Sequence, residues 1–265
     1  MGAVIGIMIG YAVVRWKAKP KTHLVAEYWV YLGSSTVPIQ DDIMSQLVKN
    51  NPHAGFTTRE ALFFSDVRVR INSVLRAKNV AAFRPDLFNG GTLTPAQITQ
   101  LADSPVFVRI KFASEEPVRD RRYLTFLMHA AAAYAALGDG VLIYDFILAK
   151  PYPIQEFLTV MQEHKDVSDP NVQTEVRWRE EGDILSAESA GMVKIGLPDL
   201  RAQDVAPDTR ILTESLLKAA IRTLWLQPSL PPEIEVEEYG DKFLFKFEPA
   251  RNGFASARVT RIQAR

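Results

Sequence analysis

Alternating apolar and polar positions predict a series of short strands. In residues 106–112, apolar side chains occupy every second position, which is the period of a strand with one buried face. Tyr239 and Gly240 lie between two further alternating runs and indicate a hairpin. We expect strands over residues 23–32, 61–75, 106–112, 141–144, 172–178, 184–186, 234–236, 243–247 and 253–262.

Helical periodicity predicts helices between these strands. Thr94 and Pro95 are typical of a helix N-cap followed by a first-turn proline. Residues 123–137 are rich in alanine and apolar on nearly every side, so we expect this helix to be buried against a sheet. The expected helices begin near residues 38, 94, 123, 151 and 207.

The order of these elements predicts an α+β fold. Strands and helices do not alternate strictly, which favours layered mixed or antiparallel sheets packed by helices, preceded by a short hydrophobic N-terminal helix. A charged connector near residues 114–122 suggests a boundary. The predicted organisation is a membrane anchor (1–16), a basic linker (17–22), a first α+β subdomain (23–114) and a second one with a strand-rich tail (115–265).

The N-terminal segment indicates a membrane anchor. Residues 2–14 carry no charge, and Arg15, Trp16 and Lys17 follow them. As a helix, this run spans about 20 Å, which is short of the ~30 Å hydrocarbon core. An apolar run that ends in tryptophan and basic residues is typical of a membrane interface with a cytoplasmic flank. We expect a single-pass protein with a cytoplasmic globular domain; the alternative is a cytoplasmic protein that buries this segment.

Three glycines in this segment suggest a contact between helices. Gly2, Gly6 and Gly10 recur every fourth residue and fall on one helix face. Small residues at this spacing allow two membrane helices to approach closely. The segment therefore predicts self-association.

Overall composition excludes several classes of function. Thirty-one basic and thirty-one acidic residues give no net charge, so we expect no nucleic-acid partner. The absence of cysteine excludes disulfides, thiolate metal ligands and cysteine nucleophiles. The four histidines are not spaced as metal ligands. We predict no catalytic, metal or cofactor-binding residue.

One candidate polar site remains, formed by His129, Tyr144, Asp145 and Asp199. Tyr144 and Asp145 end a buried strand, where functional groups often lie, although Asp145 also suits a cap for the following turn. His129 lies within the apolar helix, where a hydrogen-bonded core histidine is the alternative. A hydrolase using His129 with Asp145 or Asp199 is thus an alternative function.

An acidic strand gives a second alternative. Glu233, Glu235 and Glu237 alternate with apolar residues, and Glu238 follows them. Such charges usually discourage edge-to-edge pairing of strands. They also suit an acidic binding surface, as in an immunity-type module.

Residues 189–200 resemble a segment found in a family of uncharacterised bacterial α+β domains. That family carries Thr-His-Gly-(Leu/Met)-x-x-Phe-Gly-x-Pro-(Glu/Asp)-Leu, where this chain has Ser189 and Ala190 in place of Thr-His and Ile195 in place of Phe. The resemblance implies the fold and no activity, and a role of the family's histidine does not carry over to Ala190. From its residue types alone, we expect this stretch to form a strand, a tight turn and the approach to a helix.

The turn residues of this stretch have a structural explanation. Gly191 and Gly196 allow positive φ or close packing, and Asp199 can accept backbone amides. Taken with the N-terminal anchor, the leading hypothesis is a non-catalytic, membrane-tethered α+β domain that acts through an unknown protein partner.

Overall fold

The computed structural model of the chain describes residues 23–49, 62–88, 93–181, 184–248 and 254–262. The predicted anchor, the basic linker and the three glycines Gly2, Gly6 and Gly10 lie outside these ranges. Within the described ranges, no helix is both long and apolar enough to cross a membrane.

The first sheet has five strands in the order β2-β3-β1-β4-β5, and each neighbouring pair is antiparallel. Its central strand, β1, pairs along its whole length with β3 and along its second half with β4. The strands are β1 (Leu24–Leu32), β2 (Val69–Leu75), β3 (Val106–Ser114), β4 (Gly140–Asp145) and β5 (Lys150–Pro153).

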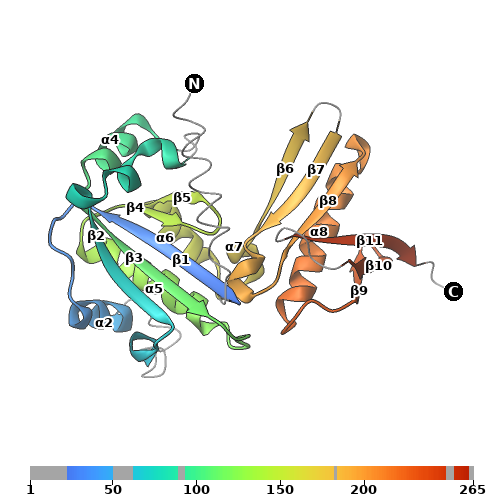
Figure 1. Cartoon of the computed structure of the whole chain (residues 1–265), viewed down its shortest axis with the longest axis horizontal. Coiled ribbons are helices and arrows are strands. Elements are labelled where there is room, and N and C mark those ends of the chain that lie inside the picture. Colours follow the sequence, from blue (N-terminus) through green and yellow to red (C-terminus); the bar gives the residue numbers. More distant parts are fainter. Residues whose placement is uncertain (1–22, 50–61, 89–92, 182–183, 249–253, 263–265) are drawn as a thin grey trace.

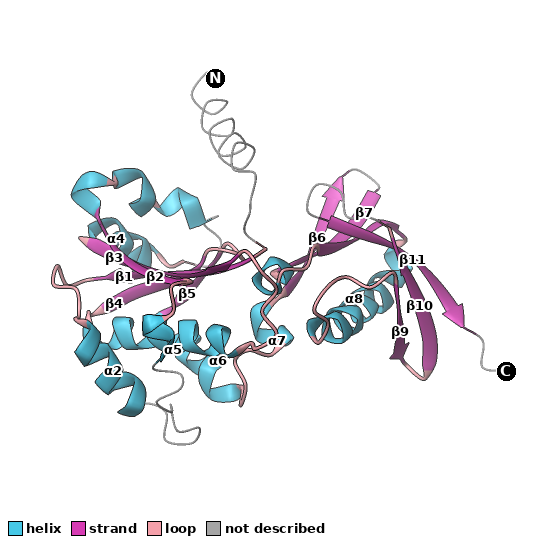
Figure 2. Cartoon of the chain, turned by 60° about the horizontal axis from the view of Figure 1, so that its bottom comes forward, coloured by secondary structure: helices cyan, strands magenta, loops and turns pink. Residues whose placement is uncertain are grey.

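Helices cover both faces of this sheet (Figure 2). On one face lie α2 (Gln40–Lys49), α5 (Arg122–Leu137) and α6 (Ile154–Glu163). As predicted, α5 is buried on most sides, and it packs on β1, β3 and β4. On the opposite face lies α4 (Pro95–Asp103). Thr94 is its N-cap, as predicted, and forms a capping box with Gln97.

The second sheet has six strands in the order β6-β7-β8-β11-β10-β9 (Figure 1). The predicted hairpin is confirmed: β9 and β10 join through Tyr239 and Gly240, both with positive φ. The helix α8 (Arg210–Trp225) lies along one face of this sheet. The strands are β6 (Glu175–Glu181), β7 (Ile184–Ala190), β8 (Asp199–Val205), β9 (Glu233–Glu238), β10 (Asp241–Phe247) and β11 (Phe254–Ile262).

The last strand, β11, connects two parts of the second sheet. Its first residues, Phe254 to Ser256, run parallel to β8, and its remaining length runs antiparallel to β10. These mixed and antiparallel sheets with their covering helices confirm the α+β fold.

The structure corrects several predicted elements. The turn after residue 190 leads into strand β8, not directly to a helix. The strand expected from residue 61 begins at Val69, because residues 62–65 form a 3-10 turn, η1. Residues 151–153 are extended, not helical. Lys150 and Tyr152 each precede a proline, and a residue in that position disfavours the helical conformation.

The charged connector after Ser114 joins two parts of one unit. Strand β1 pairs with β3 before the connector and with β4 after it, so the expected subdomain division at residues 114 and 115 falls inside the first sheet and its helices. The two sheets instead follow each other along the chain, linked by α6 and the single helical turn α7 (Pro170–Gln173). One continuous apolar core contains residues from both sheets.

Candidate functional site

A buried ion pair connects the two sheets. Asp145 is the last residue of β4, and Lys194 lies in the 3-10 turn η5 (Met192–Ile195) between β7 and β8. The Lys194 Nζ lies 2.6 Å from the Asp145 Oδ2, and the two side chains are 0% and 2% exposed. Because an unpaired buried charge is costly, each residue needs the other.

Gln173 and Tyr28 extend this pair into a network. The Lys194 Nζ also donates to the Gln173 Oε1 at 2.8 Å, and the same oxygen accepts from the Tyr28 hydroxyl at 3.1 Å. Tyr123, on α5, donates to the Lys194 carbonyl oxygen at 2.6 Å. The network therefore holds together β1, β4, α5, α7 and η5.

Burial controls the protonation of this network. Burial lowers the pKa of the Lys194 ammonium, and the Asp145 carboxylate opposes part of this effect. Burial also raises the pKa of Tyr28 well above its ordinary value, and the charge of Asp145 raises it further. Tyr28 consequently stays a neutral hydroxyl that donates a hydrogen bond.

Asp145 also caps the turn that follows it. Its Oδ1 accepts from the backbone amides of Ile147 and Leu148, each at 3.0 Å, which confirms the predicted capping role. The next residue, Ala149, has a φ of 48°, which is unusual for a residue other than glycine. One carboxylate thus fixes the β4–β5 turn and neutralises Lys194.

Asp199 has a comparable role at the other end of the stretch that includes Lys194. Its Oδ1 accepts from the Met192 amide at 3.0 Å and from the Ser189 hydroxyl at 3.2 Å. Burial raises the pKa of Asp199 to about 6. Gly191 and Gly196 have φ of 109° and 81°, so the predicted positive φ is confirmed at both glycines.

The four predicted site residues have separate roles in the structure. Tyr144 points to the face of the first sheet opposite Asp145, where its ring lies 4.8 Å from that of Phe88. His129 lies on α5, and burial lowers its pKa. Asp145 and Asp199 each hold a turn, and the charges of both oppose the lowering of the Lys194 pKa by burial.

Sequence reasoning did not find Lys194 or Gln173. The one available signal was a lysine inside the apolar run of residues 192–195, between two glycines. A charged residue in such a run implies a counter-charge, but its partner Asp145 is 49 positions away in the sequence.

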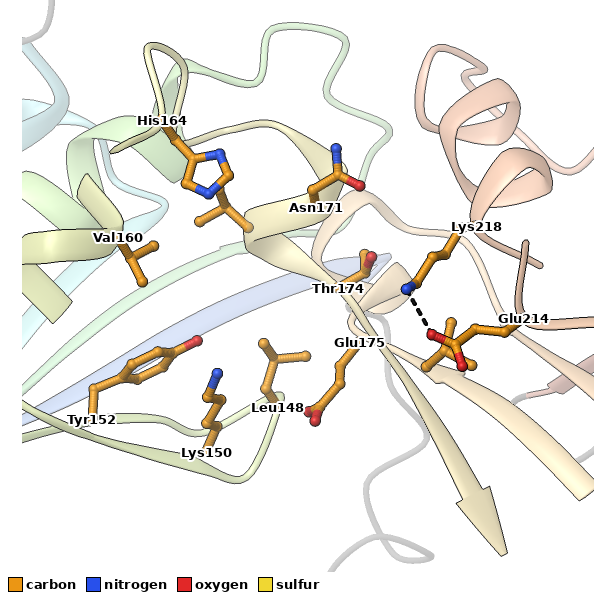
Figure 3. A pocket seen from close by; sticks show the side chains of 12 residues that line it. Leu148, Lys150, Tyr152, Val160, His164, Asn171, Thr174, Glu175, Glu214 and Lys218 are labelled. Carbon is orange, nitrogen blue, oxygen red and sulfur yellow. Dashed lines mark hydrogen bonds and ion pairs between the residues drawn. The ribbon is translucent and has the colours of Figure 1, made fainter. Parts of the chain in front are cut away.

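A polar cleft of about 390 Å³ lies beside this network, between the two sheets (Figure 3). Its walls come from the β4–β5 turn and β5, from the end of α6, from α7 with the start of β6, and from α8. The lining residues are Leu148, Lys150, Tyr152, Val160, His164, Asn171, Val172, Thr174, Glu175, Val176, Glu214 and Lys218.

Most of the charges in the cleft are paired. Lys218 lies 2.6 Å from Glu214 on α8, and Glu175 lies 3.0 Å from Arg177 on β6. The Lys150 ammonium instead lies 4.5 Å from the centre of the Tyr152 ring. Burial, with the nearby Asp145 carboxylate, raises the pKa of Tyr152, so its hydroxyl stays protonated.

The second sheet has two different faces. Trp178 faces α8 and donates to the Glu214 Oε2 at 3.1 Å, and Ile234 and Phe245 are buried on the same side. The opposite side, here called the outer face, carries mainly charged side chains. By strand register these are Glu175, Arg177, Arg179, Glu188, Arg201, Glu233, Glu235, Glu237, Lys242, Lys246 and Arg258.

Comparison of the chain with protein-family models, curated proteins and solved structures finds no match. The resemblance carried by residues 189–200 stays a prediction.

Proposed function

We propose that the chain is a non-catalytic protein-interaction module, held at a membrane by residues 1–16, which docks its partner on the outer face of the second sheet. The observation that carries this proposal is the separation of side chains on that sheet. Apolar residues pack on α8, whereas charged residues occupy the other side.

The outer face has an ordered charge pattern. Glu188 lies between two arginines, 3.1 Å from Arg179 and 2.6 Å from Arg201, and Arg201 stacks 3.8 Å from the centre of the Phe254 ring. Farther along the sheet, strand register places Lys246 beside Glu233. The face is therefore basic near its middle and acidic along β9, a pattern that could be matched by a complementary protein surface.

The acidic margin favours docking on the face over strand addition. Strand β9 is the last in the sheet order, and Glu233, Glu235 and Glu237 are exposed along it. Repeated like charges on an edge strand oppose pairing with another strand. A partner with a basic surface would instead contact these carboxylates on the outer face, without pairing its backbone with β9.

The alternative of a hydrolase has less support from the geometry. Asp145 uses one carboxylate oxygen for two backbone amides and the other for Lys194. Asp199 accepts from Met192 and Ser189. That alternative uses one of these two carboxylates together with His129, and each of them is engaged in holding a turn.

Charge reversal on β9 tests the docking surface. The full chain would be compared with the triple variant Glu233→Lys, Glu235→Lys, Glu237→Lys as bait in crosslinking and affinity capture. We expect a discrete partner to be retained by the wild type and lost by the triple variant. A control with the same change in net charge, Glu115→Lys, Glu156→Lys, Glu163→Lys, alters exposed residues of the first unit. Equal capture of the partner by all three proteins would contradict the proposal.

Fractionation tests the membrane tether. The full chain and a variant lacking residues 1–16 would be expressed side by side and separated into membrane and soluble fractions. We expect the deletion to move the protein from the membrane to the soluble fraction. An identical distribution of the two proteins would refute the tether and leave the docking surface to be judged by its own test.

A further inference from the structure

The cleft between the sheets contains one cation without a protein counter-charge. Glu214 neutralises Lys218, and Glu175 lies in an ion pair with Arg177. Within the described part of the chain, Lys150 has no carboxylate oxygen within 4.0 Å of its ammonium. Among the lysines and glutamates that line the cleft, Lys150 is therefore the one that forms no ion pair with a described residue.

Further hydrogen-bonding groups face the same space. Figure 3 shows the Tyr152 hydroxyl and the Lys150 ammonium directed into the cleft from β5, with the His164 ring facing them from the end of α6. The tyrosine is a hydrogen-bond donor because it stays protonated. An oxygen of an anionic group placed here would accept from both the ammonium and the hydroxyl.

Part of the wall of the cleft is apolar. Leu148, Val160, Val172 and Val176 line it. Sites for small molecules typically combine such walls with a few convergent polar groups in a volume of about 300–1,000 Å³. The cleft, at about 390 Å³, is at the small end of this range.

The buried ion pair holds the floor of the cleft in place. The Leu148 amide donates to Asp145, which Lys194 neutralises, and the Leu148 carbonyl oxygen accepts from Arg177. Contacts from both sheets therefore fix the position of Leu148 in the absence of a ligand. A site that is already ordered loses less entropy on binding.

We propose that this cleft binds a small organic acid, with its carboxylate on Lys150 and Tyr152 and its apolar body against Leu148 and the valines. The charge at Lys150 selects an anion, and the apolar wall selects a hydrocarbon body over a second charge. Of the residues that line this site, Glu175 alone also belongs to the outer face of the second sheet.

Binding of matched probes to the full chain tests this assignment. 3-Phenylpropanoate supplies a carboxylate on an apolar body, and 3-phenylpropan-1-ol has the same body without charge. We expect the acid to bind at least about tenfold more tightly than the alcohol, since a hydrogen bond to a charged group contributes about 1.5–3 kcal/mol. Calorimetry or ligand-observed NMR measures both affinities.

Variants then locate the bound acid. Lys150→Gln should weaken binding of 3-phenylpropanoate by about tenfold or more. Tyr152→Phe should weaken it by a smaller factor, since only a neutral donor is lost. Lys165→Gln removes an exposed lysine close to the cleft but outside its lining, and it should leave the affinity unchanged.

Three results would overturn the assignment: no binding of the acid, equal affinity for acid and alcohol, or equal affinity of the wild type and Lys150→Gln. The thermal midpoint of each variant, measured without ligand, shows whether it is folded. If Lys150→Gln is unfolded, Tyr152→Phe takes its place: weaker binding of the acid supports the assignment, and an affinity equal to that of the wild type overturns it.

Discussion

The Lys194 Nζ lies 2.6 Å from the Asp145 Oδ2, and both side chains are closed off from solvent. The pair joins the end of a strand in the first sheet to a turn of the second sheet. Loss of one partner would leave the other charge buried and uncompensated, an effect larger than the net contribution of the intact pair.

Replacement of the lysine should destabilise the fold strongly. Lys194→Met should lower the free energy of unfolding by about 3–5 kcal/mol, because it leaves Asp145 charged and buried. Urea denaturation followed by circular dichroism measures this change. Adding Asp145→Asn, which keeps an oxygen for the two turn amides, should restore part of the loss. A decrease below about 1 kcal/mol for Lys194→Met would show that the pair is not buried in solution.

Asp199 should make stability depend on pH. Burial raises its pKa from 3.8 to about 6 in the folded chain, so the folded state binds this proton more tightly than the unfolded state does. The resulting stabilisation is fully present below about pH 4 and is lost as pH rises to about 6, by no more than about 3 kcal/mol. Asp199→Asn lacks this proton. Its stability relative to the wild type should therefore increase between pH 4 and pH 6, and a difference that is constant over this range would contradict the prediction.

Gly191 should tolerate substitution less well than Gly240. Both glycines have positive φ, at 109° and 79°, so alanine is strained at either position. At Gly191, however, an added Cβ would lie 2.4 Å from the Gln173 carbonyl oxygen, whereas at Gly240 it meets nothing within 4 Å. We expect Gly240→Ala to lower the free energy of unfolding by about 1 kcal/mol. Gly191→Ala should lower it by at least about 2 kcal/mol more. Chemical denaturation compares the two, and equal costs would exclude the close contact.

Replacing Ala149 with glycine should stabilise the fold. Its φ of 48° places an alanine in the left-handed region, which costs about 1–2 kcal/mol relative to the usual conformations. Ala149→Gly should therefore raise stability by about 0.5–1 kcal/mol after the greater flexibility of unfolded glycine is counted. Ala96→Gly, in the first turn of α4, should have the opposite sign. A loss of stability in Ala149→Gly would show that the turn relaxes to another conformation.

Local chemistry explains which elements could be predicted from the sequence. The N-cap at Thr94 and the positive-φ hairpin at Tyr239 and Gly240 depend on neighbouring residues alone, and both predictions are confirmed. Strand β5 is not predicted, because the expected helix begins near residue 151, whereas Pro151 and Pro153 keep the residues before them extended.

The candidate site depended on contacts between distant residues. The role of Asp145 in its own turn could be predicted, since it involves residues two and three positions later. Its pairing with Lys194 and the contact of Tyr28 with Gln173 join residues 49 and 145 positions apart. A single sequence carries no local pattern that specifies such pairs.

The position of β11 has a consequence for the order of folding. The hairpins β6–β7 and β9–β10 close over short connections, whereas β11 must find β8 across the whole of α8 and the β9–β10 hairpin. Closing a long loop costs more entropy than closing a short one, and non-local pairings form slowly. The parallel contact of Phe254 with Asp199 is therefore expected to form late, so that the rate at which β11 docks limits how fast the second sheet is completed.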